Sequence, residues 1–432
     1  MKITERLLLI SVLVVFHSLL VGQTPTSLVT PLLVEAEPAS VGISQERLSR
    51  VDQMCSRAID QNVVPGMVVL IARKGKIVYH KAFGTADAKN GIDMQKDAIF
   101  RIASQSKAIT ATAVMMLWEE GLFRLDDPIS RYIPEFENPT VLQSFRFRDT
   151  SYSSIPADKE ITIRHLLTHT SGIGYGVIDG DERMKMIYHK AGITDLFTTK
   201  PITIEESVKK LATLPLHHNP GEKFTYSEGL DVLGYFIEVV SGMPFDEFLH
   251  TRLFDPLGMD DTYFYLPDDK ADRLVAVQTK KSGNWVHYPD TFYEVDYPKK
   301  GAKTFFSGGA GLSSTASDYA TFLQMYLNGG VYNGTRILSR TTVNAILSNQ
   351  TTDLLGSDSF YGLAFGGLTD AGAGKGGQGS AGSFRWGGYF NTQYFADPVG
   401  GVIGILMKQT QNIGRDDTGW KFGILVGQSI DD

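Results

Sequence analysis

The sequence predicts an α+β fold, in which an antiparallel sheet built from both ends of the chain is flanked by helices and carries a mostly helical insertion. Two β-rich runs, Val68–Ala72 and Lys76–Tyr79, are joined by a short turn and predict a hairpin near the N-terminus. Strand-like runs return near the C-terminus, at Ser383–Ala396 and Val402–Gln409. The intervening residues, from about 126 to 296, carry helical patterns and long loops.

The first residues predict a targeting segment. Lys2 and Arg6 supply positive charge ahead of an apolar run, Leu7 to Gly22, that fits a signal peptide better than a full membrane span. Residues 1–22 are therefore expected to be a signal peptide, with a retained N-terminal anchor as the alternative. Residues 23–40 carry Thr, Ser and Pro without a clear period and are expected to be a tether. The predicted location is the periplasm or the outside of the cell.

The remaining chain, residues 41–432, is expected to form one composite domain. Its sheet part comprises about residues 41–103 and 297–432, and its helical part comprises about residues 104–296. Helical spacing and helix-end signals predict helices at Glu46–Asn62, Ala108 to about Glu119, Ile163–Thr168, Leu230–Val240, Ser317–Leu327 and Asp417–Gln428. A cleft between the two parts is a natural ligand site.

Charge and cysteine content exclude several kinds of partner and site. The formal net charge is −7, which gives no basic footprint for nucleic acid. The single cysteine, Cys55, cannot form an intrachain disulfide, and no Cys/His ligand spacing surrounds it. His165 and His169 are four residues apart, but no Glu between them completes a His-Glu-x-x-His motif. No metal, cofactor or nucleic acid is expected, and no membrane contact beyond the targeting segment.

The run Phe100–Lys107 contains the strongest chemical signal. Ser104 and Lys107 stand at i and i+3 before an apolar helical run, so they share a helix face, with Cβ atoms about 5–6 Å apart. A serine needs a base within hydrogen-bond reach to act as a nucleophile, and a partly desolvated lysine can be that base. The pair therefore predicts a nucleophilic serine. A helix-start serine beside a snorkelling lysine is the alternative.

A second Ser-x-x-Lys pattern, Ser207 to Lys210, has a structural explanation. Thr203 and Glu206 have the spacing of a capping box, and the charged residues around them indicate a solvated helix face. Ser207 is therefore expected to be structural.

Two further segments can complete a site for acyl transfer. Tyr226 lies in a turn before a helix, where its hydroxyl can reach a cleft and move a proton. Ordinary packing of an amphipathic ring is the alternative. The run Arg385-Trp386-Gly387-Gly388-Tyr389 opens a late strand. Its paired glycines let a substrate approach the backbone, and the next N–H can stabilise an oxyanion, although glycines also mark β-bulges.

Together and in this order, these segments resemble the serine β-lactamase-like superfamily. The resemblance covers about Val41 to Ile430 and is strongest to the class C branch of β-lactamases, D-alanyl-D-alanine carboxypeptidases and family VIII carboxylesterases. The stretches that carry it are Phe100–Lys107, Leu125–Pro128, His165–Gly172, Pro220–Ser227 and Ser307–Asp318. It implies a fold like that of β-lactamases and penicillin-binding proteins.

The resemblance also implies roles for individual residues. Ser104 matches the nucleophile, Lys107 its partner base, and Tyr226 the tyrosine of the Tyr-x-Asn motif. Trp386-Gly387-Gly388 takes the place of the Lys-Thr-Gly strand and would contact substrate. The oxyanion N–H groups would come from Ser104 and Tyr389.

Two departures from the family pattern favour a neutral substrate. Glu228 stands where the motif has an amide that contacts substrate, and an ionised carboxylate there would repel an anion. Trp386 stands where β-lactamases and carboxypeptidases have a lysine that pairs with a β-lactam or peptide carboxylate. Trp386-Gly387-Gly388 instead resembles the version found in family VIII esterases. Arg385 could supply the missing cation, but strand alternation predicts that it points away if Trp386 points inward.

The expected protein is a serine hydrolase that cleaves small ester or amide substrates through an acyl-enzyme on Ser104. A β-lactamase or a D-amino-acid peptidase is the nearest alternative, so the expected partner is a small ester, amide or β-lactam. A penicillin-binding or sensor-type domain without turnover is the alternative outside enzymes.

Overall fold

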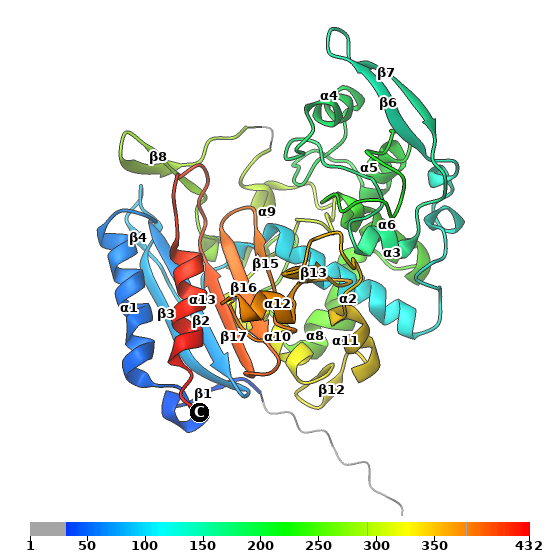
Figure 1. Cartoon of the computed structure of the whole chain (residues 1–432). Coiled ribbons are helices and arrows are strands. Elements are labelled where there is room, and N and C mark those ends of the chain that lie inside the picture. The colour runs from blue at the N-terminus through cyan, green and yellow to red at the C-terminus, as the bar shows by residue number, and fades with distance from the viewer. Residues whose placement is uncertain (1–31, 292, 377) are drawn as a thin grey trace, which may run out of the picture.

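The computed structural model describes residues 32–291, 293–376 and 378–432 (Figure 1). The predicted signal peptide, residues 1–22, and the first part of the predicted tether lie outside the described residues. None of the described helices is long and apolar enough to cross a membrane.

The end of the predicted tether is part of the folded domain. Val34–Glu35 (β1) pairs in parallel with the start of the strand Lys76–Asp87 (β3). Pro38–Val41 then forms a short 3-10 helix in which Pro38 and Val41 are buried. Backbone pairing at a sheet edge needs no periodic side-chain pattern, so the sequence did not reveal this strand.

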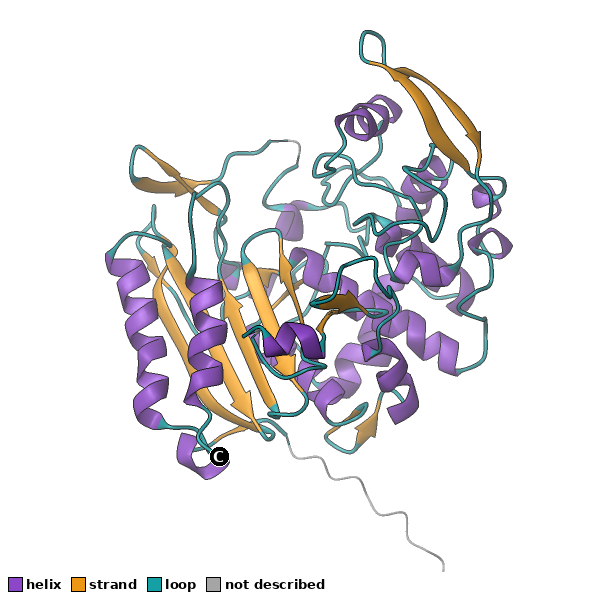
Figure 2. Ribbon diagram, in the orientation of Figure 1, coloured by secondary structure: helices purple, strands orange, loops and turns teal. Residues whose placement is uncertain are grey.

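The central sheet takes strands from both ends of the chain, and the predicted α+β class is confirmed (Figures 1 and 2). Besides β1 and β3, its strands are Gly66–Arg73 (β2), Ile92–Asp93 (β4), Ser359–Tyr361 (β13), Gly366–Leu368 (β14), Phe384–Gly388 (β15), Thr392–Asp397 (β16) and Val402–Met407 (β17). The order is β1-β3-β2-β17-β16-β15-β14-β13, with β4 paired to β3. Only the β1–β3 pairing is parallel among the described strands of this sheet.

Helices cover both faces of this sheet. The first and last helices, Gln45–Asp60 (α1) and Thr418–Ser429 (α13), lie side by side on one face, within two residues of the predicted bounds (Figure 1). Phe422 of α13 and Val69 of β2 belong to the apolar core between them. Ala316–Leu327 (α10) packs on the opposite face. Because both faces are covered, β2 is buried along its whole length, and its residues before Arg73 read as an apolar run.

The inserted part of the chain is mostly helical and packs beside the sheet (Figure 2). Its helices are Ser106–Glu119 (α2), Ile163–Leu167 (α3), Glu182–Ala191 (α4), Ile204–Leu211 (α5), Gly229–Ser241 (α6), Phe245–Leu249 (α7), Asp255–Leu257 (α8) and Tyr297–Lys300 (α9). Arg340–Leu347 (α11), Asp370–Gly374 (α12) and a small hairpin, Val331–Tyr332 (β11) and Thr335–Arg336 (β12), follow later in the chain. Helix α2 is buried from Ser106 to Leu117 and forms the centre of the molecule.

Two hairpins in the inserted part were not predicted. They are formed by Thr140–Arg146 (β6) with Ser151–Pro156 (β7), and by Gln278–Lys281 (β8) with Asn284–His287 (β9). Hairpin β6–β7 projects from the body (Figure 1), and its side chains are exposed or half-buried. No apolar face therefore marks these strands in the sequence, and the expectation of helices and loops alone was wrong here.

The late strand predicted at Ser383–Ala396 is two strands. Strand β15 ends at Gly388 and β16 begins at Thr392, and the Asn391 N–H donates to the Gly388 carbonyl at 2.9 Å. Asn391 has a φ of 74°, a left-handed conformation that asparagine tolerates better than most residues. Tyr389 therefore lies in the turn after β15 and not within a strand.

Candidate active site

Ser104 lies in a sharp backbone turn between a short strand and helix α2. Phe100–Arg101 (β5) pairs with Ser313–Ser314 (β10), and a single 3-10 turn, Ala103–Gln105, then leads directly into the helix. Ala103 has a φ of 44°, which alanine rarely adopts. Strained backbone of this kind clusters at functional sites, because the surrounding structure must hold it in place.

Lys107 is almost completely buried and makes three short polar contacts. Its Nζ lies 3.3 Å from Ser104 Oγ, 2.7 Å from Tyr175 Oη and 2.7 Å from the Gly309 carbonyl oxygen. A lysine amine can act as a base only in its neutral form, which has two N–H donors and one lone pair. If Tyr175 and Gly309 accept the two N–H groups, the lone pair is left for the Ser104 hydroxyl, which is the arrangement that a general base needs.

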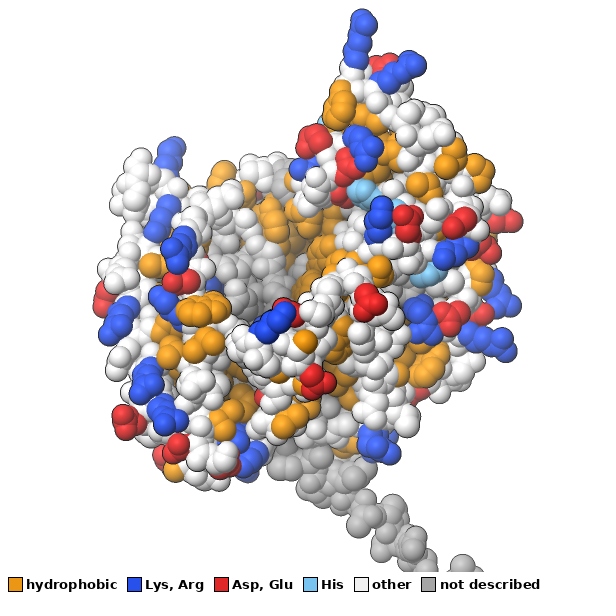
Figure 3. Space-filling view, viewed as in Figure 1, with side chains coloured by type: hydrophobic (Ala, Val, Ile, Leu, Met, Phe, Trp, Pro, Cys, Tyr) orange, Lys and Arg blue, Asp and Glu red, His pale blue; other side chains and the backbone are white. Residues whose placement is uncertain are grey.

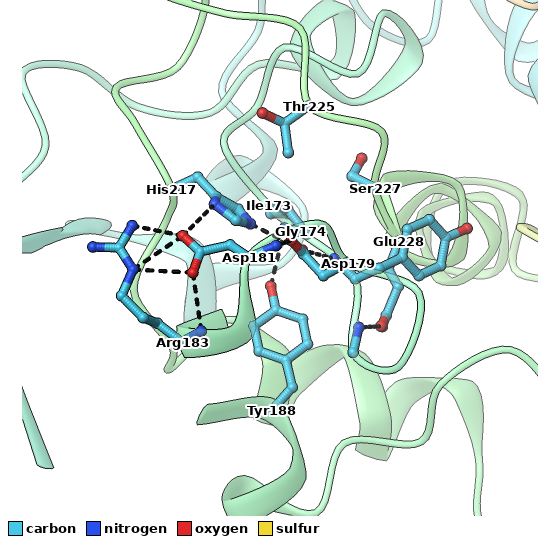
Figure 4. Close-up of polar contacts among 12 residues, drawn as sticks. Ile173, Gly174, Asp179, Asp181, Arg183, Tyr188, His217, Thr225, Ser227 and Glu228 are labelled. Carbon is cyan, nitrogen blue, oxygen red and sulfur yellow. Dashed lines mark hydrogen bonds and ion pairs between the residues drawn. The ribbon is translucent and has the colours of Figure 1, made fainter. Parts of the chain in front are cut away.

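Tyr175 was not identified from the sequence. It is fully buried, and burial together with the nearby Tyr226 raises the pKa of its hydroxyl well above the ordinary value, so it stays neutral. Its backbone N–H donates to Asp179 Oδ2 at 2.8 Å, and the same oxygen lies 2.9 Å from His217 Nε2 (Figure 4). The available sequence signal was a tyrosine between two glycines, Gly174-Tyr175-Gly176, which lacks a defined spacing to Ser104.

Asp231 and Gly309 also help to hold Lys107, and the sequence did not reveal either of them. Asp231 Oδ1 accepts from Ser307 Oγ at 2.6 Å and from the Gly309 N–H at 3.1 Å. The carbonyl of the same Gly309 contacts Lys107, so the buried carboxyl orients the peptide group that holds the lysine. A Cβ at Gly309 would lie 2.7 Å from Asp231 Oδ2, which explains why glycine stands there.

Tyr226 is held beside Lys107 by packed aromatic rings. Lys107 Nζ lies 4.6 Å from the centroid of the Tyr226 ring. The ring packs 4.6 Å from that of His169 and 5.5 Å from that of Tyr175. The Tyr226 hydroxyl accepts from Trp386 Nε1 at 3.3 Å. Ser104, Lys107, Tyr226 and Trp386 therefore form one continuous set. The face of the molecule seen in Figure 3 is hollowed between the sheet and helical parts.

Strand β15 reaches the nucleophile through its glycines. A Cβ at Gly388 would lie 2.4 Å from the Ile102 carbonyl oxygen, so the strand end packs directly on the backbone before Ser104, while Gly387 has more space. Within the described residues, the backbone N–H groups of Ser104 and Tyr389 donate to no other group, so both remain available to an oxyanion.

Glu228 does not reach this set of residues. It is 2 % exposed, and its Oε1 accepts from the Gly176 N–H at 3.3 Å (Figure 4). Burial, reinforced by the charge of Asp195, raises the pKa of Glu228 well above its ordinary value. The structure therefore gives no support to the expectation that an ionised Glu228 contacts and repels substrate; the side chain holds the loop that carries Tyr175.

The predicted orientation of Arg385 agrees with the sheet. Arg385 pairs with Phe395, whose ring contacts Phe422 of α13 at 5.9 Å. Trp386 pairs with Tyr394, whose ring contacts Tyr319 of α10 at 4.9 Å. Adjacent side chains of the strand thus leave on opposite faces, and Arg385 leaves on the face of α13.

The contacts of His169 and of the second Ser-x-x-Lys pattern are those of structural residues. His169 Nδ1 accepts from the Ser227 N–H at 3.2 Å, and burial lowers the pKa of His169 well below its ordinary value. Among the described residues, no group of three His, Cys, Asp or Glu side chains could hold a metal ion. Thr203 and Glu206 form the predicted capping box at the start of α5, on which Ser207 is buried.

Comparison with known proteins identifies the family to which the chain belongs. The Beta-lactamase family profile matches residues 51–428. The chain belongs to the beta-lactamase family. Esterase EstB of Burkholderia gladioli is 31% identical over 393 residues, which cover 87% of this beta-lactamase-family chain and 93% of EstB.

Other relatives of this beta-lactamase-family chain differ in their described activities. The solved structure of EstCE1, described as a hydrolase with promiscuous acyltransferase activity, has a TM-score of 0.73 and 26% identity, covering 88% of this chain and 99% of EstCE1. A putative D-alanyl-D-alanine carboxypeptidase of Escherichia coli strain K12 is 28% identical over 344 residues, covering 75% of this chain and 74% of that protein. With esterase and carboxypeptidase relatives, the chain is a serine hydrolase.

Proposed function

We propose that this chain is an esterase that cleaves small neutral esters through an acyl-enzyme on Ser104, in the periplasm or outside the cell. The observation that carries the proposal is the buried Lys107 amine, 3.3 Å from Ser104 Oγ and held on its other side by Tyr175 and Gly309. Similarity to EstB and EstCE1 supports an ester as the substrate.

The first half of the reaction forms the acyl-enzyme. Lys107 takes the proton of the Ser104 hydroxyl while Ser104 Oγ bonds to the ester carbonyl carbon, and the carbonyl oxygen becomes an oxyanion. The free N–H groups of Ser104 and Tyr389 stabilise that charge. The carbon–oxygen bond to the alcohol then breaks, and the proton held by Lys107 passes to the departing oxygen, with Tyr226 positioned to relay it.

The second half repeats these steps with water. A water molecule gives its proton to the Lys107–Tyr226 pair and bonds to the acyl carbon, and the bond to Ser104 Oγ then breaks as the pair returns that proton to Oγ. The products are a carboxylic acid and the free serine. An alcohol in place of water would form a new ester with the same residues, which is how acyl transfer would arise.

The substrate preference rests on Trp386. The indole donates to Tyr226 at 3.3 Å. By the sequence resemblance, it stands where β-lactamases and carboxypeptidases have the lysine of their Lys-Thr-Gly motif. A substrate carboxylate therefore finds no cation from this face of the strand, and losing a charge-assisted hydrogen bond typically costs about 1.5–3 kcal/mol. A neutral ester has no carboxylate to pair with a lysine, so tryptophan at this position costs it no hydrogen bond.

The decisive comparison is kcat/KM for p-nitrophenyl butyrate against nitrocefin and D-Ala-p-nitroanilide. We expect the ester to exceed nitrocefin, which carries a carboxylate, by at least about tenfold, the lower limit set by the missing charge-assisted bond, and to exceed the anilide as well. Ser104→Ala should reduce its turnover to background. A higher value for nitrocefin or the anilide would replace the esterase proposal with a β-lactamase or peptidase.

Covalent labelling separates an enzyme from a binding domain. A fluorophosphonate probe should add one adduct by intact mass, which Ser104→Ala abolishes and Ser207→Ala leaves unchanged. An adduct on Ser207, or a labelled Ser104 without turnover of any of these substrates, would contradict the proposal.

A further inference from the structure

A cavity lies next to the proposed catalytic residues, beside strand β15 and the start of α13. It has a volume of about 490 Å³, within the range of about 300–1,000 Å³ typical of small-molecule sites. Its walls come from β15, β16, the segment that carries β13 and β14, and the first turns of α13. Phe360, Phe395 and Phe422 supply much of the apolar lining.

The cavity contains one cation and no anion. Arg385 is the only charged residue among its described lining residues. Arg385 is half-buried, and in the described part of the chain its guanidinium makes neither an ion pair nor a hydrogen bond. By contrast, Arg73 and Arg164 hold aspartates at 2.5 and 2.6 Å. A partly desolvated guanidinium with five unused donors is matched best by a carboxylate or phosphate.

The rest of the lining selects between anions. Gln393, from β16, adds an amide that makes no hydrogen bond within the described residues, while aromatic rings make up much of the rest of the lining. A phosphate would leave most of its oxygens against these rings, where a desolvated charge is unfavourable. A carboxylate can be paired by one guanidinium. The apolar tail of a monocarboxylic acid can then occupy the aromatic part of the cavity.

The cavity shares a wall with the proposed active site. Trp386 lines it, and the same indole donates to the Tyr226 hydroxyl at 3.3 Å. Phe224 also lines it and contacts His169, with ring centroids 5.7 Å apart. Ser104 and Lys107 are not among the lining residues, so a ligand can occupy this cavity while Ser104 remains free.

We propose that this cavity binds a free monocarboxylate with a medium-length apolar tail, with the carboxylate on Arg385 and the tail among Phe360, Phe395 and Phe422. Neither Ser104 nor Lys107 lines this site, which adjoins the acyl-transfer site through Phe224, Tyr361, Trp386 and Gly387.

Isothermal titration of sodium octanoate into the full-length Ser104→Ala chain tests this site without relying on catalysis. We expect one octanoate per chain. Arg385→Gln should weaken binding about tenfold to hundredfold, the effect of losing a charge-assisted hydrogen bond. Arg50→Gln, which removes an exposed arginine of α1, is the matched control and should leave the affinity unchanged. 1-Octanol, which keeps the tail and lacks the charge, should bind at least about tenfold more weakly.

Two results would overturn the proposal. One is equal octanoate affinity in the parent and the Arg385→Gln chain, or equal affinity for octanol and octanoate. The other is loss of octanoate binding when Ser104 of the wild-type chain is capped by a small fluorophosphonate, since the ligand would then occupy the catalytic site. Retained binding after capping supports a separate cavity. Failure of the esterase assay alone would leave this binding result intact.

Discussion

At the scale of single residues, the site depends on how the buried Lys107 amine is held. Its three polar contacts come from Ser104, Tyr175 and Gly309, which lie on three separate segments of the chain. The two shorter contacts orient the amine and the longer one faces the nucleophile. Tyr175 and Gly309 therefore act as positioning residues for Lys107 in the proposed mechanism.

Tyr175→Phe should lower kcat/KM for p-nitrophenyl butyrate about tenfold to hundredfold, since it removes one hydrogen bond to the lysine. The ring packing against Tyr226 is retained, so the melting temperature should change little. Tyr188→Phe is the matched control, because Tyr188 is an equally buried tyrosine whose hydroxyl accepts from the Gly174 N–H and does not contact Lys107. Equal activity losses in both variants would show that Tyr175 matters only for packing.

Lys107→Ala and Tyr226→Phe should each lower turnover by at least about 10²-fold, the lower end for a lost acid–base group. Because the two residues act on the same proton, the double variant should be little worse than either single variant. Near-normal turnover in Tyr226→Phe, measured in steady-state assays, would show that another group moves the proton.

At the scale of elements, one buried ion pair attaches the last helix to the sheet. Lys408 follows β17 and Asp416 precedes α13, with 2.6 Å between Nζ and Oδ2 and both side chains almost fully buried. Asp416 Oδ1 also accepts from the N–H and the hydroxyl of Thr418, at 2.9 and 2.7 Å. Burial opposes ionisation, but the Lys408 charge and these hydrogen bonds outweigh it and lower the pKa of Asp416 to about 2.

Asp416→Asn should lower the free energy of unfolding by at least about 2 kcal/mol at pH 7, from the pKa change alone, and by more because Lys408 is left unpaired. The native pKa lies below the unfolded value, so this stabilisation is complete above about pH 5 and is lost as the pH falls toward 2. Urea unfolding at pH 7, 5 and 3 should show the gap between wild type and variant narrowing at acidic pH.

Asp417→Asn is the control for this measurement. Asp417 pairs with Lys421 on the surface, one helical turn away, and such exposed pairs contribute about 0.3–0.5 kcal/mol. A gap between wild type and Asp416→Asn that stays constant from pH 7 to pH 3 would contradict the assigned role of the ion pair.

At the scale of the whole molecule, the site exists because distant parts of the chain meet. The nucleophile follows β5, which pairs with β10 more than 200 residues later, and the end of β15 packs on the Ile102 carbonyl. The helical part adds Tyr175 and Tyr226. The sheet formed by both ends therefore sets the distance between Ser104 and the proposed oxyanion donor Tyr389.

Gly388→Ala should disturb this junction, because the new Cβ would lie 2.4 Å from the Ile102 oxygen and 2.3 Å from Thr392 Oγ1. Displacement of the strand by even a fraction of an ångström moves the Tyr389 N–H, and we expect kcat to fall by about 10²-fold, the effect of losing one oxyanion donor. Gly374→Ala, where a Cβ meets nothing within 4 Å, should retain activity. Wild-type kcat in a folded Gly388→Ala chain would exclude this role for the strand end.

The sequence alone determined the features that arise from local pattern. Apolar spacing predicted α1, α10 and α13 to within two residues, and the β-rich runs predicted that the sheet draws on both ends of the chain. The i, i+3 spacing of Ser104 and Lys107 predicted their contact, because helix geometry fixes the distance between such residues.

Only the tertiary structure decided which other side chains surround that pair. Tyr175 and Gly309 reach Lys107, and Asp231 holds Gly309, from segments whose spacing to Ser104 carries no periodic signal. It also buried Glu228 against the loop that carries Tyr175 and placed Arg385 in the lining of a cavity. The physical reason is that a helix or a strand is specified by neighbours a few residues apart. A site like this one is specified by where chain segments more than 60 residues apart come to pack.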